Sequence, residues 1–315
     1  MATSTSTRAL RIVADALVMP LYGTLDRFAA GVFTGGDCLD ESLLYRNRVP
    51  ALYGEPSPAE AVLRALEPGG ADRLQGDYLF GGYLFRHYGH FLIESLARAY
   101  ALKRCPPFPI IFSSTHREIM PWQYDMFKLL GLRNPIVKLT RPALVERLFL
   151  SPPGFTLPDM VTDEQIAALG SMPAPPLTEK KIWLSRSSHL GGGLLNEKDL
   201  HPHLEAMGWE IVHPQYLPVR KQVALIASSA RVAGVDGSAF HTALLAEEVR
   251  GRFDIFFLRN TGSHAYTRIA ELKGFTQRET LLSPETGTVR FLHGEAAQRF
   301  YELRDPESIL SVLRD

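Results

Sequence analysis

The residues best suited to acid–base chemistry lie in one short stretch, residues 85–103. Within it His90, Glu94 and Arg98 recur every four residues, and no proline interrupts the chain before Pro106. In an α-helix this spacing places the three titratable side chains on one face. An imidazole beside a carboxylate could take a proton from a hydroxyl group, with one member of the pair orienting the other. The sequence therefore predicts an acid–base site in which either histidine or glutamate is the base.

The element that must position these groups is a helix predicted over residues 89–104. Leucine, alanine, arginine and lysine dominate its second half, and Tyr88 and Gly89 supply the turn before it. Because most of its remaining residues are apolar, we expect the helix to be buried. Its polar stripe must then find partners or line a cleft.

Two other interpretations of this stripe stay open. In a purely structural one, Glu94 pairs with Arg98 and His90 caps the start of the helix. In the other, His87, His90 and Glu94 ligate zinc in the manner of a metallohydrolase, although His87 is predicted to precede the helix.

The composition is that of an ordinary globular chain. It has 315 residues, 45% hydrophobic and 22% charged, with 34 basic and 34 acidic residues. This balance argues against a nucleic-acid-binding protein. The only cysteines, Cys38 and Cys105, are too few for a disulfide framework and fit a reducing compartment.

No stretch of the sequence looks like a targeting or membrane-spanning segment. The first twenty residues lack the uninterrupted apolar run of a signal peptide, and nothing approaches the ~18 apolar residues of a membrane span. We therefore expect a cytoplasmic protein. It could rest at the inner face of a membrane through a partner or a lipid-linked substrate.

Two α/β domains are predicted, residues 1–170 and residues 180–315, joined by a proline-rich linker over 171–179. In the second domain, strands recur at intervals of roughly 20–30 residues with a helix in each gap, which is typical of a parallel sheet with helices on both faces. Its predicted strands are 181–184, 210–213, 230–235 and 254–258, and its predicted helices are 197–207, 219–227, 239–248 and 306–313.

Two loops of this second domain follow strands, where parallel sheets bind their ligands. The first, residues 185–193, contains Arg186, which could grip a phosphate through two hydrogen bonds, and three glycines more typical of a flexible loop. The second contains Asp236, Gly237 and Ser238 before a predicted helix, whose backbone N–H groups could bind an anion. Together the loops predict a diphosphate site, although the second alone is also typical of an ordinary capped turn.

Several motifs of this chain occur in a fixed order. They are Tyr88-Gly89-His90 with an acid four positions after the histidine, Leu184-Ser185-Arg186, Asn196-Glu197, GWEIV at 208–212, Gln222, and ARVAGVDGS at 230–238. In this series the chain resembles glycosyltransferase family 61, particularly its bacterial branch linked to capsular and other surface polysaccharides. The likeness covers roughly residues 78–250.

The resemblance implies a GT-B-like architecture, in which two Rossmann-like domains face a cleft. It also implies an inverting transfer from a nucleotide sugar, with a UDP-sugar favoured, to a glycan or lipid-linked glycan, without an obligatory metal or other cofactor. By position, His90 and Glu94 match the family's histidine and acidic pair, and Arg186 matches its Ser-Arg strand end. Asn196 and Glu197 match its Asn-Glu helix start. A non-catalytic member that binds a nucleotide sugar or glycan within an assembly complex is a further alternative.

The chain departs from the family in the second loop, often written HGAG, of which Gly237 matches the first glycine. The departures are Asp236 for the usual histidine, Ser238 for the alanine and Ala239 for the second glycine, with His241 shortly after. A carboxylate beside a diphosphate would repel it. We therefore expect Asp236 to face a hydroxyl group or to pair with a cation such as Arg186 or His241.

Overall fold

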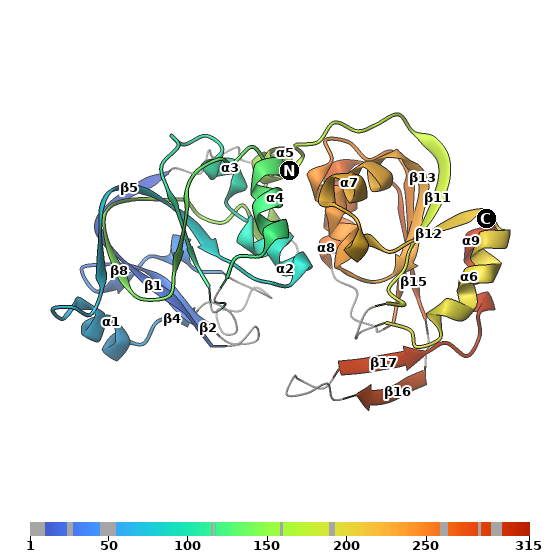
Figure 1. The fold of residues 1–315 in the computed structure, drawn as a ribbon, viewed down its shortest axis with the longest axis horizontal. Helices are drawn as coiled ribbons and strands as arrows, with labels where there is room; N and C mark the ends of the chain where they lie inside the picture. Colours follow the sequence, from blue (N-terminus) through green and yellow to red (C-terminus); the bar gives the residue numbers. More distant parts are fainter. Residues whose placement is uncertain are drawn as a thin grey trace, which may run out of the picture. The chain divides into compact units, whose positions relative to one another are not determined.

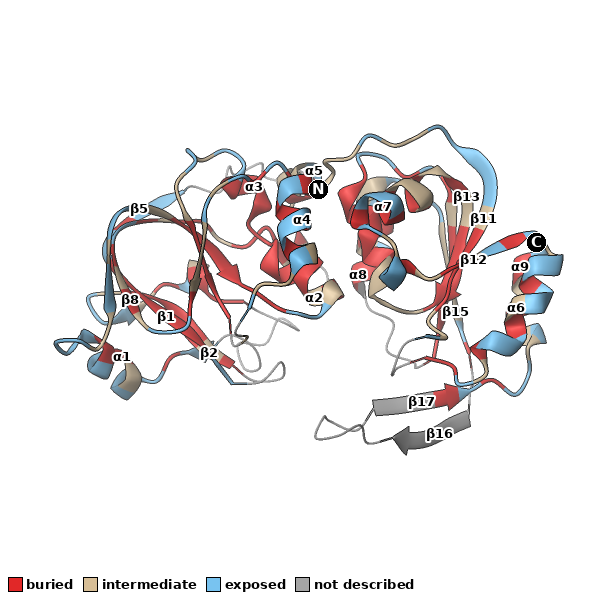
Figure 2. Ribbon diagram, in the orientation of Figure 1, coloured by how far each residue is buried: buried red, intermediate tan, exposed pale blue. Residues whose placement is uncertain are grey.

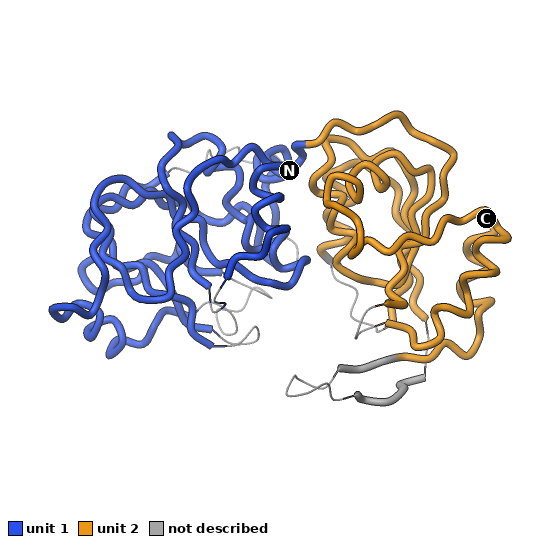
Figure 3. The backbone as a smooth tube through the Cα atoms, in the orientation of Figure 1, with its two compact units in different colours: residues 1–171 blue, residues 172–315 orange. Residues whose placement is uncertain are grey.

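The computed structural model describes most of the chain in two compact units, Met1–Ser171 and Met172–Asp315 (Figure 3). The residues it describes are 10–23, 28–44, 55–114, 116, 118–157, 160–188, 193–258, 264–282, 285–290 and 298–315. The glycine-rich part of the first predicted loop, residues 189–192, lies outside this set. We treat each unit by itself.

Unit 1 is built on an eight-stranded mixed sheet in the order β3-β2-β1-β8-β5-β6-β7, with β4 pairing β2 (Figure 1). Neighbouring strands from β8 to β7 are parallel, whereas β1 is antiparallel to both β2 and β8. This unit therefore departs from a Rossmann-like parallel sheet in its first strands. The strands are β1 (Arg11–Gly23), β2 (Phe28–Thr34), β3 (Asp37–Cys38), β4 (Glu55–Pro56), β5 (Asp72–Tyr83), β6 (Ile110–Ser113), β7 (Ile136–Leu139) and β8 (Ala143–Leu150).

The helices of unit 1 are short, and the one predicted over residues 89–104 is not continuous. It is divided into α2, a π-helical segment η2 and, after a turn, α3. The helical segments are η1 (Asp40–Ser42), α1 (Ala59–Leu66), α2 (Tyr88–His90), η2 (Phe91–Ser95), α3 (Ala99–Leu102), α4 (Pro121–Leu129) and α5 (Asp163–Leu169), and a small hairpin pairs β9 (Phe155–Thr156) with β10 (Met160–Val161).

Unit 2 contains a five-stranded sheet, β12-β11-β13-β14-β15, in which every neighbouring pair is parallel. Helices α7 (Val219–Ser228) and α8 (His264–Lys273) cover one face, and α6 (Glu197–Ala206) and α9 (Glu307–Arg314) cover the other (Figure 1). The predicted parallel sheet with helices on both faces is therefore confirmed. The strands are β11 (Thr178–Leu184), β12 (Trp209–Val212), β13 (Ser229–Val235), β14 (Arg252–Phe257) and β15 (Gln277–Leu281), with a hairpin of β16 (Glu285–Arg290) and β17 (Gln298–Glu302).

Three of the four helices predicted in unit 2 are present as α-helices, one differs in type, and the helical segments at 214–216 and 264–273 were not predicted. The segment after β13 is a 3-10 helix, η4, where an α-helix over residues 239–248 was expected. The elements are α6 (Glu197–Ala206), η3 (Pro214–Tyr216), α7 (Val219–Ser228), η4 (Ser238–Leu245), α8 (His264–Lys273) and α9 (Glu307–Arg314).

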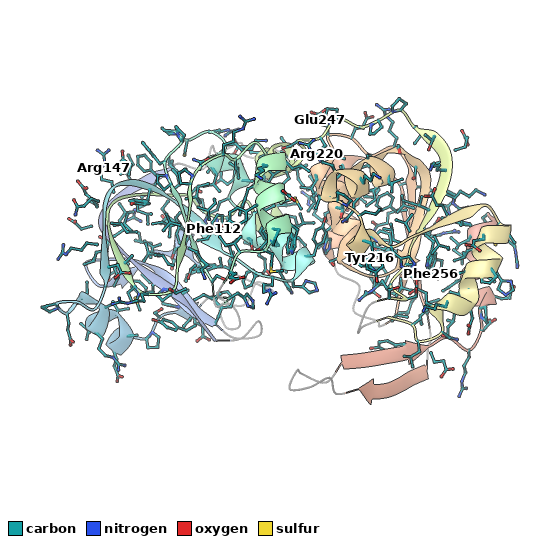
Figure 4. All side chains as sticks on the ribbon, in the orientation of Figure 1. Phe112, Arg147, Tyr216, Arg220, Glu247 and Phe256 are labelled. Carbon is teal, nitrogen blue, oxygen red and sulfur yellow. The ribbon has the colours of Figure 1, made fainter. Side chains whose placement is uncertain are left out.

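Each unit has its own apolar core, visible as the buried centre of its sheet in Figure 2. Phe112 lies inside unit 1 and Phe256 inside unit 2, whereas Arg147 lies at the surface of unit 1 (Figure 4). None of the helices described combines the length and the apolar character that crossing a bilayer requires.

A buried carboxylate fastens the last helix of the chain to the sheet of unit 2. Asp254, almost fully buried, accepts hydrogen bonds from Arg231 (2.8 Å) and Arg278 (2.8 Å), and Arg252 lies 3.3 Å away. Arg231 also donates to the carbonyl of Leu313 in α9 (2.9 Å). Ionic and backbone contacts thus add to the apolar packing of α9.

Candidate functional site

The segment from α2 to α3 is broken because other parts of unit 1 take over its backbone groups. Within η2, the N–H of Leu96 donates to the carbonyl of Phe91, five residues back (3.0 Å). The carbonyl of Leu96 then accepts from the Gln165 side chain (2.7 Å), and that of Ala97 accepts from the backbone of Gly154 (2.6 Å). Since these carbonyls are engaged elsewhere, the regular helix stops here. Short π-helical segments occur often at functional sites.

His90 and Glu94 form the close pair that their spacing predicts. Nδ1 of His90 lies 2.6 Å from Oε2 of Glu94. The carboxylate is only 2% exposed, whereas the imidazole is 27% exposed and packs against the rings of Phe85 and His87 (6.0 and 4.9 Å between centroids). The pair thus consists of a buried carboxylate that holds an imidazole reachable from solvent.

Arg98 does not continue the stripe of these two residues. It is completely buried, donates to the carbonyls of Ser151 (2.9 Å) and Glu41 (2.7 Å), and lies 5.1 Å over the ring of Phe80. Among the described residues no carboxylate forms an ion pair with it, so the alternative Glu94–Arg98 pair is wrong. The π-helical segment and the turn after it rotate Arg98 off the shared face.

The charge of Arg98 is held without a carboxylate partner. Burial lowers the pKa of its guanidinium to about 10, so the group remains a cation at neutral pH. Two backbone carbonyls and an aromatic face stabilise it instead. Arg98 therefore supports the strands and turns around the pair without belonging to it.

The residues before the pair have packing roles. The ring of Tyr88 lies against that of Trp122 (5.6 Å between centroids), and Trp122 also contacts the ring of Phe91 (5.0 Å). Gly89, which follows Tyr88, is buried. His87 contacts the His90 ring. The part of the chain that the structure describes contains no group of three or more His, Cys, Asp or Glu side chains able to hold a metal ion, so the zinc alternative lacks its ligand set.

In unit 2, the predicted loops meet where the strand order reverses. Strand β11 has β12 on one side and β13 on the other, which is the switch point at which open α/β sheets bind ligands. Arg186 follows β11 and donates to the carbonyl of Asp236, which follows β13. Its guanidinium also lies against Gly237, where a Cβ atom would be 2.7 Å from Nη1 of Arg186. These three residues form what we call the switch-point cluster.

Glu197 and Asn196 hold the backbone around this cluster through hydrogen bonds. Glu197 is 1% exposed and accepts from the backbone N–H of Arg186 (3.0 and 3.1 Å) and from Nε1 of Trp183 (2.9 Å). Asn196 exchanges two hydrogen bonds with the backbone of Leu303 (2.8 and 3.0 Å). The Asn-Glu helix start thus fixes the loop that carries Arg186 and the final segment of the chain.

Asp236 uses its carboxylate to hold the end of the neighbouring strand. Oδ1 of Asp236 accepts from the backbone N–H of Leu258, directly after β14 (3.4 Å). Its backbone carbonyl accepts a hydrogen bond from the guanidinium of Arg186. The pairing of its carboxylate with a cation stays a prediction. The residue therefore orders the strand ends at the switch point.

Tyr266, on α8, completes the surroundings of this loop. Burial raises the pKa of its hydroxyl, the charge of Asp236 raises it further, and Arg186 and a hydrogen bond from the Gly237 backbone oppose this. The ring of His241 stacks on Tyr266 with 4.8 Å between centroids. The helix predicted after Ser238 is the 3-10 helix η4, which includes Ser238 and has Gly237 as its N-cap.

Sequence reasoning missed the importance of Tyr266 and Trp183. Tyr266 comes shortly after a strand and borders the loop that contains Gly237. The sequence alone does not show that η4 brings the ring of His241 onto that of Tyr266. Trp183 reads as a core residue, and it is indeed buried. Its indole N–H, however, is one of the two donors that hold the carboxylate of Glu197, the other being the backbone N–H of Arg186.

Comparison with known proteins identifies one family. A family model described as Glycosyltransferase 61 matches residues 88–251, more than half of the chain. The matched span begins at the residue before Gly89 and includes both the His90–Glu94 pair and the switch-point cluster. No protein with a curated description matches the chain.

Proposed function

Because the chain belongs to glycosyltransferase family 61, we propose that it transfers a hexosyl or pentosyl group from a nucleotide sugar to a hydroxyl group of a glycan or lipid-linked glycan. In this proposal the chain is a GT-B-type enzyme in which unit 2 binds the donor and unit 1 serves the acceptor. A UDP-sugar is the donor we favour. The resemblance of its motifs to the bacterial branch supports a role in surface polysaccharide assembly, on the cytoplasmic side of the membrane.

The observation that carries this proposal is the His90–Glu94 pair. Nδ1 of the imidazole is engaged by the carboxylate at 2.6 Å, so a proton from the acceptor would be taken at Nε2. Glu94, at 2% exposure, cannot be reached by an acceptor as readily as His90 at 27%. We therefore assign His90 as the base and Glu94 as the group that orients it and stabilises the imidazolium.

One accessible base is the requirement of an inverting transfer. The acceptor oxygen attacks the anomeric carbon, His90 takes its proton, and the bond to the diphosphate breaks with the electron pair leaving on the phosphate oxygen. A retaining double displacement would need a nucleophile that touches the sugar. The buried, hydrogen-bonded carboxylate of Glu94 does not fit that role.

On the donor side we propose that Arg186 offsets the charge of the leaving diphosphate. The absence of a side chain at Gly237 lets the guanidinium lie close to the backbone of the second loop, at the strand-order switch point. Glu197 fixes the backbone from which Arg186 projects. In our proposal this reaction uses no metal ion, because the cation beside the departing phosphates is supplied by the protein.

Donor binding can be tested before the acceptor is known. In a thermal-shift panel of UDP-, GDP-, CMP- and dTDP-sugars, we expect one donor class to raise the melting temperature of the protein by mass action. The increase should be lost in Arg186→Gln and kept in Arg220→Gln, a change at an exposed arginine of α7 in the same unit (Figure 4). A panel in which no nucleotide sugar stabilises the protein would contradict the proposal.

A further inference from the structure

Cationic side chains gather at one edge of the sheet in unit 1. Strands β5, β6 and β7 are parallel and in register up to their last residues, so their carboxyl ends lie at a common edge. Arg86 and His116 come three residues after the ends of β5 and β6, and Lys138 is the last residue but one of β7. We call these three residues the basic cluster. The function proposed above assigns them no role.

Local contacts order the segments that carry the members of the cluster. Nζ of Lys138 donates to the carbonyl of His116 (2.7 Å), and the N–H of His116 donates to Oγ of Ser114 (3.2 Å). A terminal nitrogen of Arg86 lies 3.2 Å from Sδ of Met120, just beyond His116 in the chain. The folded chain therefore brings two permanent cations and an imidazole from three different strand ends to one place.

The positive charges act on one another there. The pKa of His116 is lowered first by burial and then by the charges of Arg86 and Lys138. Both cations thus lie close enough to disfavour a third positive charge at the imidazole. A bound anion would relieve this repulsion, and cationic side chains at strand ends are a common means of binding phosphate and carboxylate groups.

The chain connects the basic cluster to the His90–Glu94 pair through His87. Arg86 is followed by His87, whose ring contacts that of His90 with 4.9 Å between centroids. The residue before Arg86, Phe85, is fixed by Ser95 and Gln123, which bond its N–H and carbonyl (2.9 Å each).

We propose that the basic cluster binds an anionic group of the acceptor, a phosphate or a carboxylate, beside the hydroxyl group that His90 deprotonates. The acceptor would then be a phosphate-linked glycan or a glycan with an acidic sugar. This inference rests on the proposed function, because it assumes that unit 1 serves the acceptor. It specifies that the acceptor is anionic, because an uncharged glycan would bring no opposite charge to the cations of the cluster.

Histidine imidazole NMR spectra of the full chain test the inference with defined probes. Inorganic phosphate and glucuronate are titrated, with glucose as the uncharged control, in saturating nucleoside diphosphate so that the switch-point cluster of unit 2 is occupied. The His116 signals are assigned from His116→Gln. We expect a saturable shift with phosphate or glucuronate and none with glucose. A stronger effect of phosphate indicates a phosphate-linked acceptor, and a stronger effect of glucuronate indicates an acidic sugar.

Charge-neutralising variants add a control for general charge effects. Arg86→Gln and Lys138→Gln should weaken the apparent affinity about tenfold, as expected for the loss of one charge-assisted contact. Arg133→Gln, an exposed arginine before β7 at the opposite end of that strand, should leave it unchanged. If neither anion shifts the His116 signals, or if Arg133→Gln weakens binding as much as the cluster variants do, the inference is wrong.

This result is separable from the proposed function. Donor binding is read from the thermal shift and from Arg186→Gln, which involve unit 2 alone. Failure of anion binding with donor stabilisation intact overturns the basic cluster only. Loss of donor stabilisation with anion binding intact overturns the proposed transferase instead.

Discussion

His90 and Glu94 show what residue types and spacing can predict. An i, i+4 separation is kept across the change from α2 to η2, so the two groups meet at 2.6 Å as expected. Arg98, four residues further on, is not predicted correctly, because the backbone between them is held by Gln165 and Gly154. These partners are more than 50 residues away in the sequence, and no local pattern predicts their contacts.

Glu197 illustrates the same limit at the donor side. Its place in an Asn-Glu helix start could be read from the sequence, but its role could not. The structure shows a buried carboxylate that holds the backbone of Arg186 and the indole of Trp183. A role of this kind depends on which loop lies above the helix, and a single sequence does not specify that.

Gly237 allows a prediction about Arg186 at the residue scale. In Gly237→Ala the new Cβ atom would be 2.7 Å from Nη1 of Arg186, so the flexible guanidinium must move away while the fold is kept. We expect donor affinity to fall about tenfold, as for the loss of one charge-assisted hydrogen bond. Calorimetric titration with the stabilising donor measures this.

Gly193→Ala is the matched control for that change. Its Cβ atom would lie 3.6 Å from Cβ of Arg186, which is ordinary contact, so donor affinity should stay at the wild-type value. Equal affinities for the two variants would show that the position of the Arg186 guanidinium does not matter to the donor.

At the scale of elements, the first four strands of unit 2 were predicted from the sequence, whereas β15 to β17 and the first strands of unit 1 were not. Strand β1 contains Pro20, a change of register between Met19 and Tyr22, and Asp15 at a positive φ of 47°. These features interrupt the alternation by which a strand is recognised. The parallel strands of unit 2, by contrast, are short apolar runs separated by helices, a pattern that survives local irregularity.

Strand β5 offers a test of the contact between sheet and buried arginine. Gly82 has φ +102° and a Cβ atom there would be 2.6 Å from Nη1 of Arg98, whereas Gly76 has φ +94° with open space around its Cβ position. Gly76→Ala should cost about 1–2 kcal/mol, the usual penalty of a positive φ. Gly82→Ala should cost roughly 1–3 kcal/mol more, because it also displaces a fully buried cation.

Chemical denaturation of both variants measures the difference in their free energies of unfolding. A larger loss for Gly82→Ala supports Arg98 as a fixed part of the scaffold around η2. Equal losses would mean that the side chain of Arg98 can move at no cost, which contradicts its role in holding that segment.

At the scale of the whole molecule, one partly buried lysine, Lys273, gives stability a pH dependence. Lys273 at the end of α8 donates to the carbonyl of Ala246 (2.6 Å), and burial lowers its pKa to about 8 from the ordinary 10.5, with Glu247 opposing the shift. Between these two values the unfolded chain binds more protons than the folded one. Stability should therefore rise with pH across this window.

Lys273→Met removes that contribution. We expect the melting temperature of this variant to rise less between pH 8 and 10 than that of the wild type. Lys221→Met, at an exposed lysine of α7, is the control and should keep the wild-type profile. An unchanged pH profile in Lys273→Met would show that the group titrates normally in the folded protein.

Release of nucleoside diphosphate from the stabilising donor, in the presence of charged and uncharged glycan acceptors, tests the central claim most directly. We predict that Glu94→Gln lowers this rate by roughly 10²–10⁴-fold, because the imidazole of His90 loses the carboxylate that orients it. The same variant should keep the donor-induced rise in melting temperature, and Glu118→Gln, at an exposed glutamate of the same unit, should turn over like the wild type. A folded Glu94→Gln protein that transfers sugar at the wild-type rate would contradict the account.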